Sequence, residues 1–198
     1  RITMDAVLNQ KFADAIWAAK SLFDRSRTTG SSANLSFRHG DVLYVSGSGT
    51  CFGRLTPESF SAVSMTTGEV LNGVKPSKEL PLHRMCYEKD EAIGAVIHTH
   101  SFYATLYACV PHSYETSVVP DYTPYLKMKV GNIALVPYAK PGSEELFGYF
   151  REKVHTADAY LLANHGGVVP GKTVMDAFYG IEELEESCHI AWELERNR

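Results

Sequence analysis

The sequence predicts an α/β protein with a single three-layer domain, in which helices cover a mainly antiparallel or mixed central sheet. Its 198 residues are about the length of one domain. Helical and strand patterns both occur along the chain, and hairpin turns separate several of the strands. Because strict alternation of strand and crossover helix is absent, a purely parallel sheet is not expected. We expect the domain to span residues 4–198 and give no weight to residues 1–3, which precede Met4.

Periodicity and turn residues place the elements in order. Apolar residues at helical spacing predict helices over residues 4–24, 102–109, 143–154 and 173–195, the last two capped by Ser143 and Thr173. β-rich runs predict strands over residues 35–38, 42–45, 92–100, 133–137 and 159–164, and a hairpin near residues 62–70. A further helix is expected within residues 76–90. Since Pro81 favours a first helical turn, Ser77, Lys78 and Glu79 should stand at or just before its start.

Composition excludes several classes of protein. Lysine and arginine number 19 against 23 aspartate and glutamate, a net charge of −4, which argues against a nucleic-acid-binding protein. No apolar run approaches the roughly 18 residues of a membrane helix, so we expect no membrane partner. The four cysteines stand far apart without a C-x-x-C pair, which excludes a disulfide framework and favours the reducing cytoplasm.

The strongest chemical feature is His98-Thr99-His100, at the end of a predicted strand. Residues two apart lie on the same face of a strand, so both imidazoles should converge. Two such histidines can also be merely hydrogen-bonded. A third, His165, ends another apolar strand and is followed by two glycines. Three histidines with an open fourth position are typical of a catalytic zinc site.

Glu79 is the candidate carboxylate. Near a metal it could be a ligand, a general base or both, but taken alone a glutamate at this position is more often a solvated residue at a helix start. The small-residue loops around Asn34 and Ser48-Gly49, together with Ser77-Lys78, offer hydroxyls, an amide and one cation suited to phosphate. Each loop alone is more often an ordinary turn, and none matches the nucleotide-binding P-loop.

Other polar residues have a simpler structural interpretation. His83 and His189 fall within helical patterns and are expected to be packing or surface residues. The run Glu182–Glu186 is expected to be a solvated helix face. Ser101 lacks the G-x-S-x-G surroundings of a hydrolase nucleophile.

These motifs in this order resemble the class II aldolase/adducin family. The segments that carry the resemblance cover nearly the whole chain: Gly30–Ser36, Ser48-Gly49, Pro76–Glu79, His98–His100 and Ala163–Gly166. It implies the class II aldolase/adducin head fold. It also implies that His98, His100 and His165 bind a divalent metal, usually Zn²⁺, with Mn²⁺ or Co²⁺ as alternatives. Glu79 is implied as the catalytic acid/base and a resting ligand.

The resemblance also implies where substrate binds. Phosphate contacts map to Asn34, Ser48, Gly49 and Ser77. Lys78 stands where the aldolases usually carry a second serine, as expected if the substrate has a carboxylate besides its phosphate. Family members form tetramers with active sites at subunit interfaces, so Asp121, Tyr122 and Tyr125 could be supplied by a neighbouring subunit.

Within the family, four stretches resemble the members that decarboxylate 3-oxo-tetronate 4-phosphate to dihydroxyacetone phosphate: Pro76–Glu79, Thr123–Tyr125, Val136–Tyr138 with Pro141-Gly142, and Glu182–Glu186. The expected partner is therefore a phosphorylated sugar acid. An aldolase of the fuculose-phosphate type or a ribulose-phosphate 4-epimerase is the alternative. A non-catalytic adducin-like module is less favoured, since all three histidines and Glu79 are present.

Overall fold

The structure is a computed structural model that describes the backbone of residues 2–197 and the side chains of residues 6–197. Arg198, the last residue of the predicted domain, lies outside the described residues. All the helices predicted from periodicity are present. The N-caps predicted at Ser143 and Thr173 are confirmed, because their side chains accept hydrogen bonds from the amides of Leu146 and Asp176.

A seven-stranded sheet forms the centre of the molecule, in the order β3-β2-β1-β4-β7-β6-β5. Among the described strands, β5 and β6 pair in parallel and the other neighbours are antiparallel. The predicted mixed, mainly antiparallel sheet is therefore confirmed. The strands are β1 (Asn34–His39), β2 (Val42–Ser46), β3 (Phe60–Ser64), β4 (Ala95–Thr99), β5 (Ile133–Val136), β6 (Ala159–Leu162) and β7 (Gly166–Gly171).

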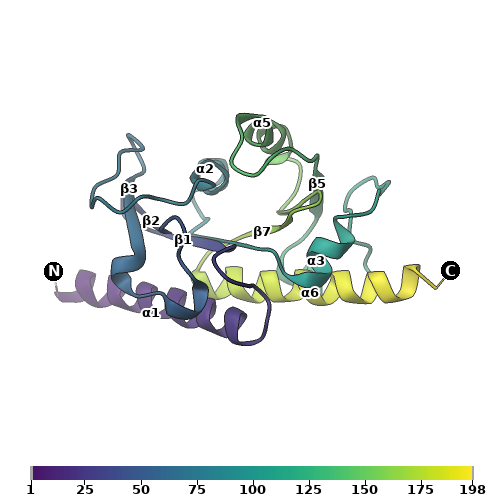
Figure 1. Ribbon diagram of the computed structural model, residues 1–198, viewed down its shortest axis with the longest axis horizontal. Helices are drawn as coiled ribbons and strands as arrows, with labels where there is room; N and C mark the ends of the chain where they lie inside the picture. Colours follow the sequence, from purple (N-terminus) through teal and green to yellow (C-terminus); the bar gives the residue numbers. More distant parts are fainter. Residues whose placement is uncertain (1, 198) are drawn as a thin grey trace.

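Helices cover both faces of this sheet, as Figure 1 shows. The helices are α1 (Ile2–Asp24), α2 (Leu80–Lys89), α3 (Phe102–Tyr107), α4 (Tyr125–Lys129), α5 (Glu144–Lys153) and α6 (Val174–Glu195). The core between the sheet and helices α1, α3 and α6 includes Ala95 and Ile97 of β4. The core beneath α2 and α5 includes Val96. Because side chains alternate along a strand, His98 follows Val96 onto the α2 face.

Two parts of the sheet differ from the prediction. β7 was not expected, because Gly166, Gly167 and Pro170 are poor strand formers. Central pairing on both sides, with β4 and β6, overrides that preference. The hairpin expected near residues 62–70 is reduced to β3 and one isolated bridge between Val63 and Val70.

The acidic run on α6 is another correction, since it is not a uniformly solvated face. The Glu185 side chain is buried and accepts hydrogen bonds from the amides of Tyr103 and Ala104, at 3.1 and 2.8 Å. It also pairs with Arg27 at 3.3 Å. Burial is possible because the α3 amides and a guanidinium satisfy the carboxylate.

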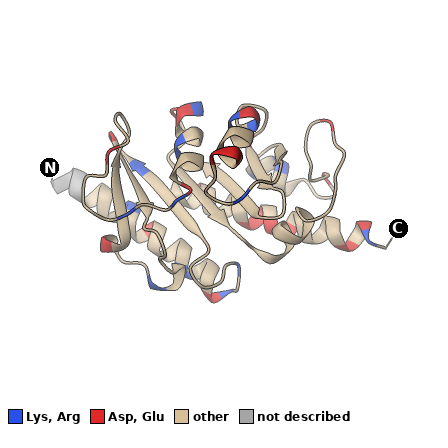
Figure 2. Cartoon of the chain, turned by 45° about the horizontal axis from the view of Figure 1, so that its top comes forward, with Lys and Arg blue, Asp and Glu red and all other residues tan. Residues whose placement is uncertain are grey.

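Positions of basic and acidic residues are interspersed along the chain, as the blue and red segments of the cartoon in Figure 2 show. Within residues 2–197, no helix is long and apolar enough to cross a membrane. All four cysteines are free thiols.

Candidate functional site

Three histidines converge where β4 and β6 end. His98 lies in β4, His100 follows that strand, and His165 lies in the turn between β6 and β7. The Nε2 atom of His98 is 3.1 Å from that of His100 and 3.2 Å from that of His165. One nitrogen from each ring falls in a group whose members lie within 4.8 Å of one another. The structure thus brings together all three histidines predicted from the sequence.

Local backbone chemistry makes this convergence possible. Gly167 pairs with Thr99 across the β4–β7 ladder, so the chain after His165 runs directly beside the end of β4. A Cβ atom at Gly166 would lie 2.2 Å from the Thr99 carbonyl oxygen and 3.0 Å from the His100 ring. Only glycine fits this approach. Asn164 turns the chain with a positive φ of 58°, a conformation that asparagine tolerates better than most residues.

One hydrogen bond determines which ring nitrogen of His98 can accept a proton or a metal ion. Its Nδ1 atom donates to the carbonyl oxygen of Gly167 at 2.8 Å, since a carbonyl can only accept. The neutral ring then carries its lone pair on Nε2. A lone pair this close to other ring nitrogens and to a carboxylate is best satisfied by a cation. Imidazole nitrogens with a carboxylate suit Zn²⁺ and other divalent transition metals, so this donor set fits such an ion.

Glu79 joins the cluster from the start of α2. It stands immediately before that helix, at the N-cap position, and it is buried. Its Oε2 atom is 3.0 Å from His98 Nε2, and its Oε1 atom is 3.2 Å from His165 Nε2. Burial opposes ionisation, but the charges and hydrogen bonds of His98 and His165 outweigh it and hold the pKa of Glu79 well below its usual range. The carboxylate is therefore ionised, and the interpretation of Glu79 as a solvated helix-start residue is wrong.

The pKa values of the other two histidines, His100 and His165, are lowered. Burial lowers the pKa of His100 to about 3, and the nearby His98 acts in the same direction. Burial also lowers the pKa of His165, which Glu79 partly offsets. Lys78 contributes to both decreases, which places its positive charge close to this pair. Neutral imidazoles are the form that ligates metal ions.

A cavity of about 410 Å³ opens onto the cluster. Its lining includes every residue predicted for phosphate or substrate: Asn34, Ser48, Gly49, Ser77 and Lys78. Glu79, His100 and His165 of the cluster also line it. The Ser48 amide donates to the Lys75 carbonyl at 2.9 Å and ties the second small-residue loop to the segment before α2. Six parts of the chain that are separated in sequence therefore line one cavity of the size usual for small ligands.

Sequence reasoning missed two contributors to this site. Pro141 lines the cavity from the loop before α5. His83, expected to be an ordinary packing residue, is buried in α2 and hydrogen-bonds Asn34, which in turn contacts Glu79. The spacing of four between Glu79 and His83 was an available signal, because it stacks the two on one helical side.

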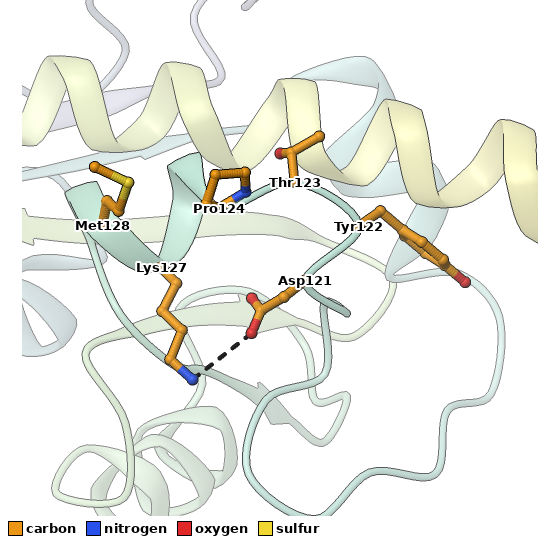
Figure 3. A pocket seen from close by; sticks show the side chains of 6 residues that line it. All are labelled: Asp121, Tyr122, Thr123, Pro124, Lys127 and Met128. Atoms are coloured by element: carbon orange, nitrogen blue, oxygen red, sulfur yellow. Dashed lines mark ion pairs between the residues drawn. The ribbon is translucent and has the colours of Figure 1, made fainter.

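The residues predicted for a neighbouring subunit lie elsewhere in this chain. Asp121 and Tyr122 line a separate shallow pocket of about 350 Å³ beside α4, with Thr123, Pro124, Lys127 and Met128. Figure 3 shows Tyr122 pointing away from the ion pair of Asp121 with Lys127, which measures 3.6 Å. Tyr125 is 58% exposed. None of the three lines the histidine cavity of the same chain as far as the structure describes it.

Known proteins share this sequence and architecture. The chain is 39% identical over 173 residues to a 3-oxo-tetronate 4-phosphate decarboxylase of Escherichia coli (strain K12), covering 87% of this chain and 81% of that relative. It is 35% identical to an L-fuculose phosphate aldolase of Methanococcus maripaludis, covering 85% and 89%. The crystal structure of YgbL from Klebsiella pneumoniae, described as an aldolase/epimerase/decarboxylase, superimposes with a TM-score of 0.88 at 35% identity, covering 94% and 90%.

The family assignment follows from the extent of one further match. The sequence model of the class II aldolase and adducin N-terminal domain matches residues 13–192, which include every strand of the sheet and the whole candidate site. The chain therefore belongs to the class II aldolase and adducin family.

Proposed function

We propose that this protein is a metal-dependent carbon–carbon lyase that converts 3-oxo-tetronate 4-phosphate to dihydroxyacetone phosphate and CO₂. The observation that carries the proposal is the meeting of three histidine nitrogens and an ionised glutamate beside one cavity, which a lysine also lines. The identity to relatives named as 3-oxo-tetronate 4-phosphate decarboxylases supports the choice of substrate. Residues 4–198 would form one catalytic domain.

His98, His100 and His165 would hold the divalent ion, with Glu79 as a further ligand in the resting state. Zn²⁺ is our first choice, because three imidazoles and an open position are typical of catalytic zinc. Such an ion would act as a Lewis acid toward the substrate's ketone and so ease the loss of CO₂.

The remaining cavity residues would orient the substrate. Ser48 and Gly49 on one loop and Ser77 before α2 would bind the phosphate, together with Asn34. The positive end of the α2 dipole favours an anion here. Lys78 would pair with the substrate carboxylate. By holding the substrate carboxylate beside the histidines, Lys78 would fix the orientation of the C1–C2 bond before it breaks.

Glu79 would handle the proton. Cleavage of the C1–C2 bond releases CO₂ and leaves the electron pair on C2 as an enediolate with the neighbouring carbonyl. A carboxyl group at Glu79, once protonated from water, would donate its proton to C2 and give dihydroxyacetone phosphate. The presence of this buried carboxylate in the lining of the cavity supports the role.

Two wider properties belong to the same proposal. We propose a homotetramer in which Asp121, Tyr122 and Tyr125 of one subunit complete the active site of its neighbour. Their position outside the histidine cavity of the same chain supports this arrangement.

We also propose that the protein works in the cytoplasm, and its four free thiols support this localisation.

Aldol cleavage of a sugar phosphate is the second candidate. The 35% identity to an L-fuculose phosphate aldolase favours it. Cleavage next to a ketone gives the same enediolate, so the same cavity residues would serve either reaction. The leaving fragment, an aldehyde or CO₂, decides between them.

The test is CO₂ release from 3-oxo-tetronate 4-phosphate by zinc-loaded protein, with a chelator-treated sample as control. We expect CO₂ and dihydroxyacetone phosphate in equal amounts, and neither in the control. No CO₂ from protein with stoichiometric zinc would contradict the decarboxylase. Cleavage of L-fuculose 1-phosphate by that sample would support the aldolase.

A further inference from the structure

A chain of buried polar side chains runs from the interior of the protein to Glu79. It comprises Tyr87 and His83 of α2, Ser36 and Asn34 of β1, and then Glu79 itself. All five residues are buried, and His83 is 1% exposed. The contacts are Tyr87 OH to Ser36 Oγ at 2.8 Å, Ser36 Oγ to His83 Nδ1 at 2.7 Å, His83 Nε2 to Asn34 Oδ1 at 2.5 Å, and Asn34 Nδ2 to Glu79 Oε2 at 3.2 Å.

Donor and acceptor chemistry gives this chain one direction. The Glu79 carboxylate can only accept, so the Asn34 amide must present its NH₂ group to it. The carbonyl oxygen of that amide then faces His83, whose Nε2 must carry the proton. In the neutral ring, Nδ1 is consequently an acceptor and takes the Ser36 hydroxyl proton. The Ser36 oxygen accepts from Tyr87 in turn, so every bond points toward the carboxylate.

We propose that His83 is a positioning residue, which orients the Asn34 amide and thereby holds one oxygen of Glu79 in place for proton transfer. This inference rests on the proposed function of Glu79. It assigns no contact between His83 and substrate, metal or reacting atoms.

Two physical features make His83 suited to this role. An asparagine side chain can rotate, and the reversed amide would set its carbonyl oxygen against the Glu79 carboxylate. Only a donor facing the amide oxygen blocks that orientation, and His83 provides it. Burial also keeps the ring neutral, lowering its pKa to about 3, so the required tautomer persists across the physiological range. Hydrogen bonds in a buried chain of this kind polarise and strengthen one another.

A pair of substitutions separates positioning from packing. His83→Gln keeps an N–H donor for Asn34, whereas His83→Leu fills the space without one. We expect His83→Leu to lower kcat about 10- to 100-fold, the usual loss when an outer partner of a site is removed. KM should change less than kcat because Asn34 is only one of the proposed phosphate contacts, zinc content should stay within about twofold, and His83→Gln should recover most of kcat. His155→Leu, at an exposed histidine of the same chain, is the control and should match the unsubstituted protein.

The unsubstituted protein offers a test that needs no variant to fold. Nitrogen-15 NMR of histidine-labelled protein should show His83 protonated on Nε2, bare on Nδ1 and unchanged from pH 5 to 8. The His83→Gln spectrum assigns the signal. An Nδ1-protonated ring, titration in that range, or equal kcat in the Gln and Leu variants would overturn the proposal. Failure of the proposed function would show separately, as absence of turnover in the unsubstituted protein.

Discussion

Among the side chains that the structure describes, two carboxylates are buried, and their surroundings differ. Glu185 of α6 is 2% exposed, and Glu79 before α2 is 4% exposed. Glu185 meets permanent partners, namely two backbone amides of α3 and the Arg27 guanidinium. Glu79 meets two histidine rings and an amide, at the edge of a cavity.

The difference separates a structural charge from a chemical one. The partners of Glu185 cannot lose their protons at ordinary pH, and Glu185 is not among the residues that line the histidine cavity. Glu79 faces groups that titrate or can bind a metal, and ligand can reach it. Burial alone therefore does not mark a functional carboxylate. The nature of its partners and the access to a cavity do.

Of all the substitutions considered, removing a histidine that contacts Glu79 should have the largest effect on activity and metal binding. In His98→Ala, the ring that contacts both other histidines and Glu79 is gone, so three donors no longer converge. We expect turnover to be lost and the metal content to fall well below that of the unsubstituted protein. Elemental analysis after dialysis measures this. Unchanged stoichiometric metal would refute the assignment of His98 as a ligand.

Glu79→Gln should separate chemistry from metal binding. The amide keeps the shape of the side chain but cannot deliver a proton, so kcat should fall about 10²- to 10⁴-fold. Metal should remain bound, because three histidines are unchanged. Steady-state kinetics and metal analysis on the same sample provide the measurement. Full activity in this variant would end the acid/base role.

Glu185→Ala should instead cost stability. It leaves Arg27 and two α3 amides without their carboxylate, and breaking a buried pair costs about 3 to 5 kcal/mol. Because Arg27 is partly exposed, we expect about 3 kcal/mol in urea unfolding. In the folded fraction, kcat should change little.

The matched control for this change is Glu183→Ala, at a partly exposed position on the same helix. It should alter the free energy of unfolding by less than about 0.5 kcal/mol. If both variants unfold at the same urea concentration, Glu185 is not the structural charge that its contacts indicate.

Lys78→Ser should have the smallest effect. The ammonium lies at the cavity near His100 and His165, and losing one hydrogen bond to a charged group should raise KM for the oxo acid about tenfold. kcat should fall less than in Glu79→Gln. Kinetics at fixed ionic strength test this, and an unchanged KM would mean that Lys78 does not contact substrate.

Much of this architecture could be predicted because it is local in sequence. Helical spacing, capping residues and Pro81 placed the start of α2, and with it Ser77, Lys78 and Glu79. The two-residue period put His98 and His100 on one side of the chain. The second small-residue loop and the segment before α2 were identified by residue type, and both do line the cavity.

Other features depended on contacts between distant segments. β7 has a poor strand sequence and exists because β4 and β6 pair with it on both sides. Within the acidic run Glu182–Glu186 of α6, Glu185 is buried, and nothing in the sequence of that run distinguishes it from its neighbours. Its burial follows from packing α6 against α3 and Arg27.

By itself, the sequence determined most of the helices and strands, the mixed character of the sheet and the residue types of the site, because spacing and propensity act over a few residues. Only the tertiary structure decided that His165 meets His98, that Asn34 stands between His83 and Glu79, and that Glu185 turns inward. Those relations join residues 45 or more positions apart. Strand register and helix packing set them, and no local pattern encodes either.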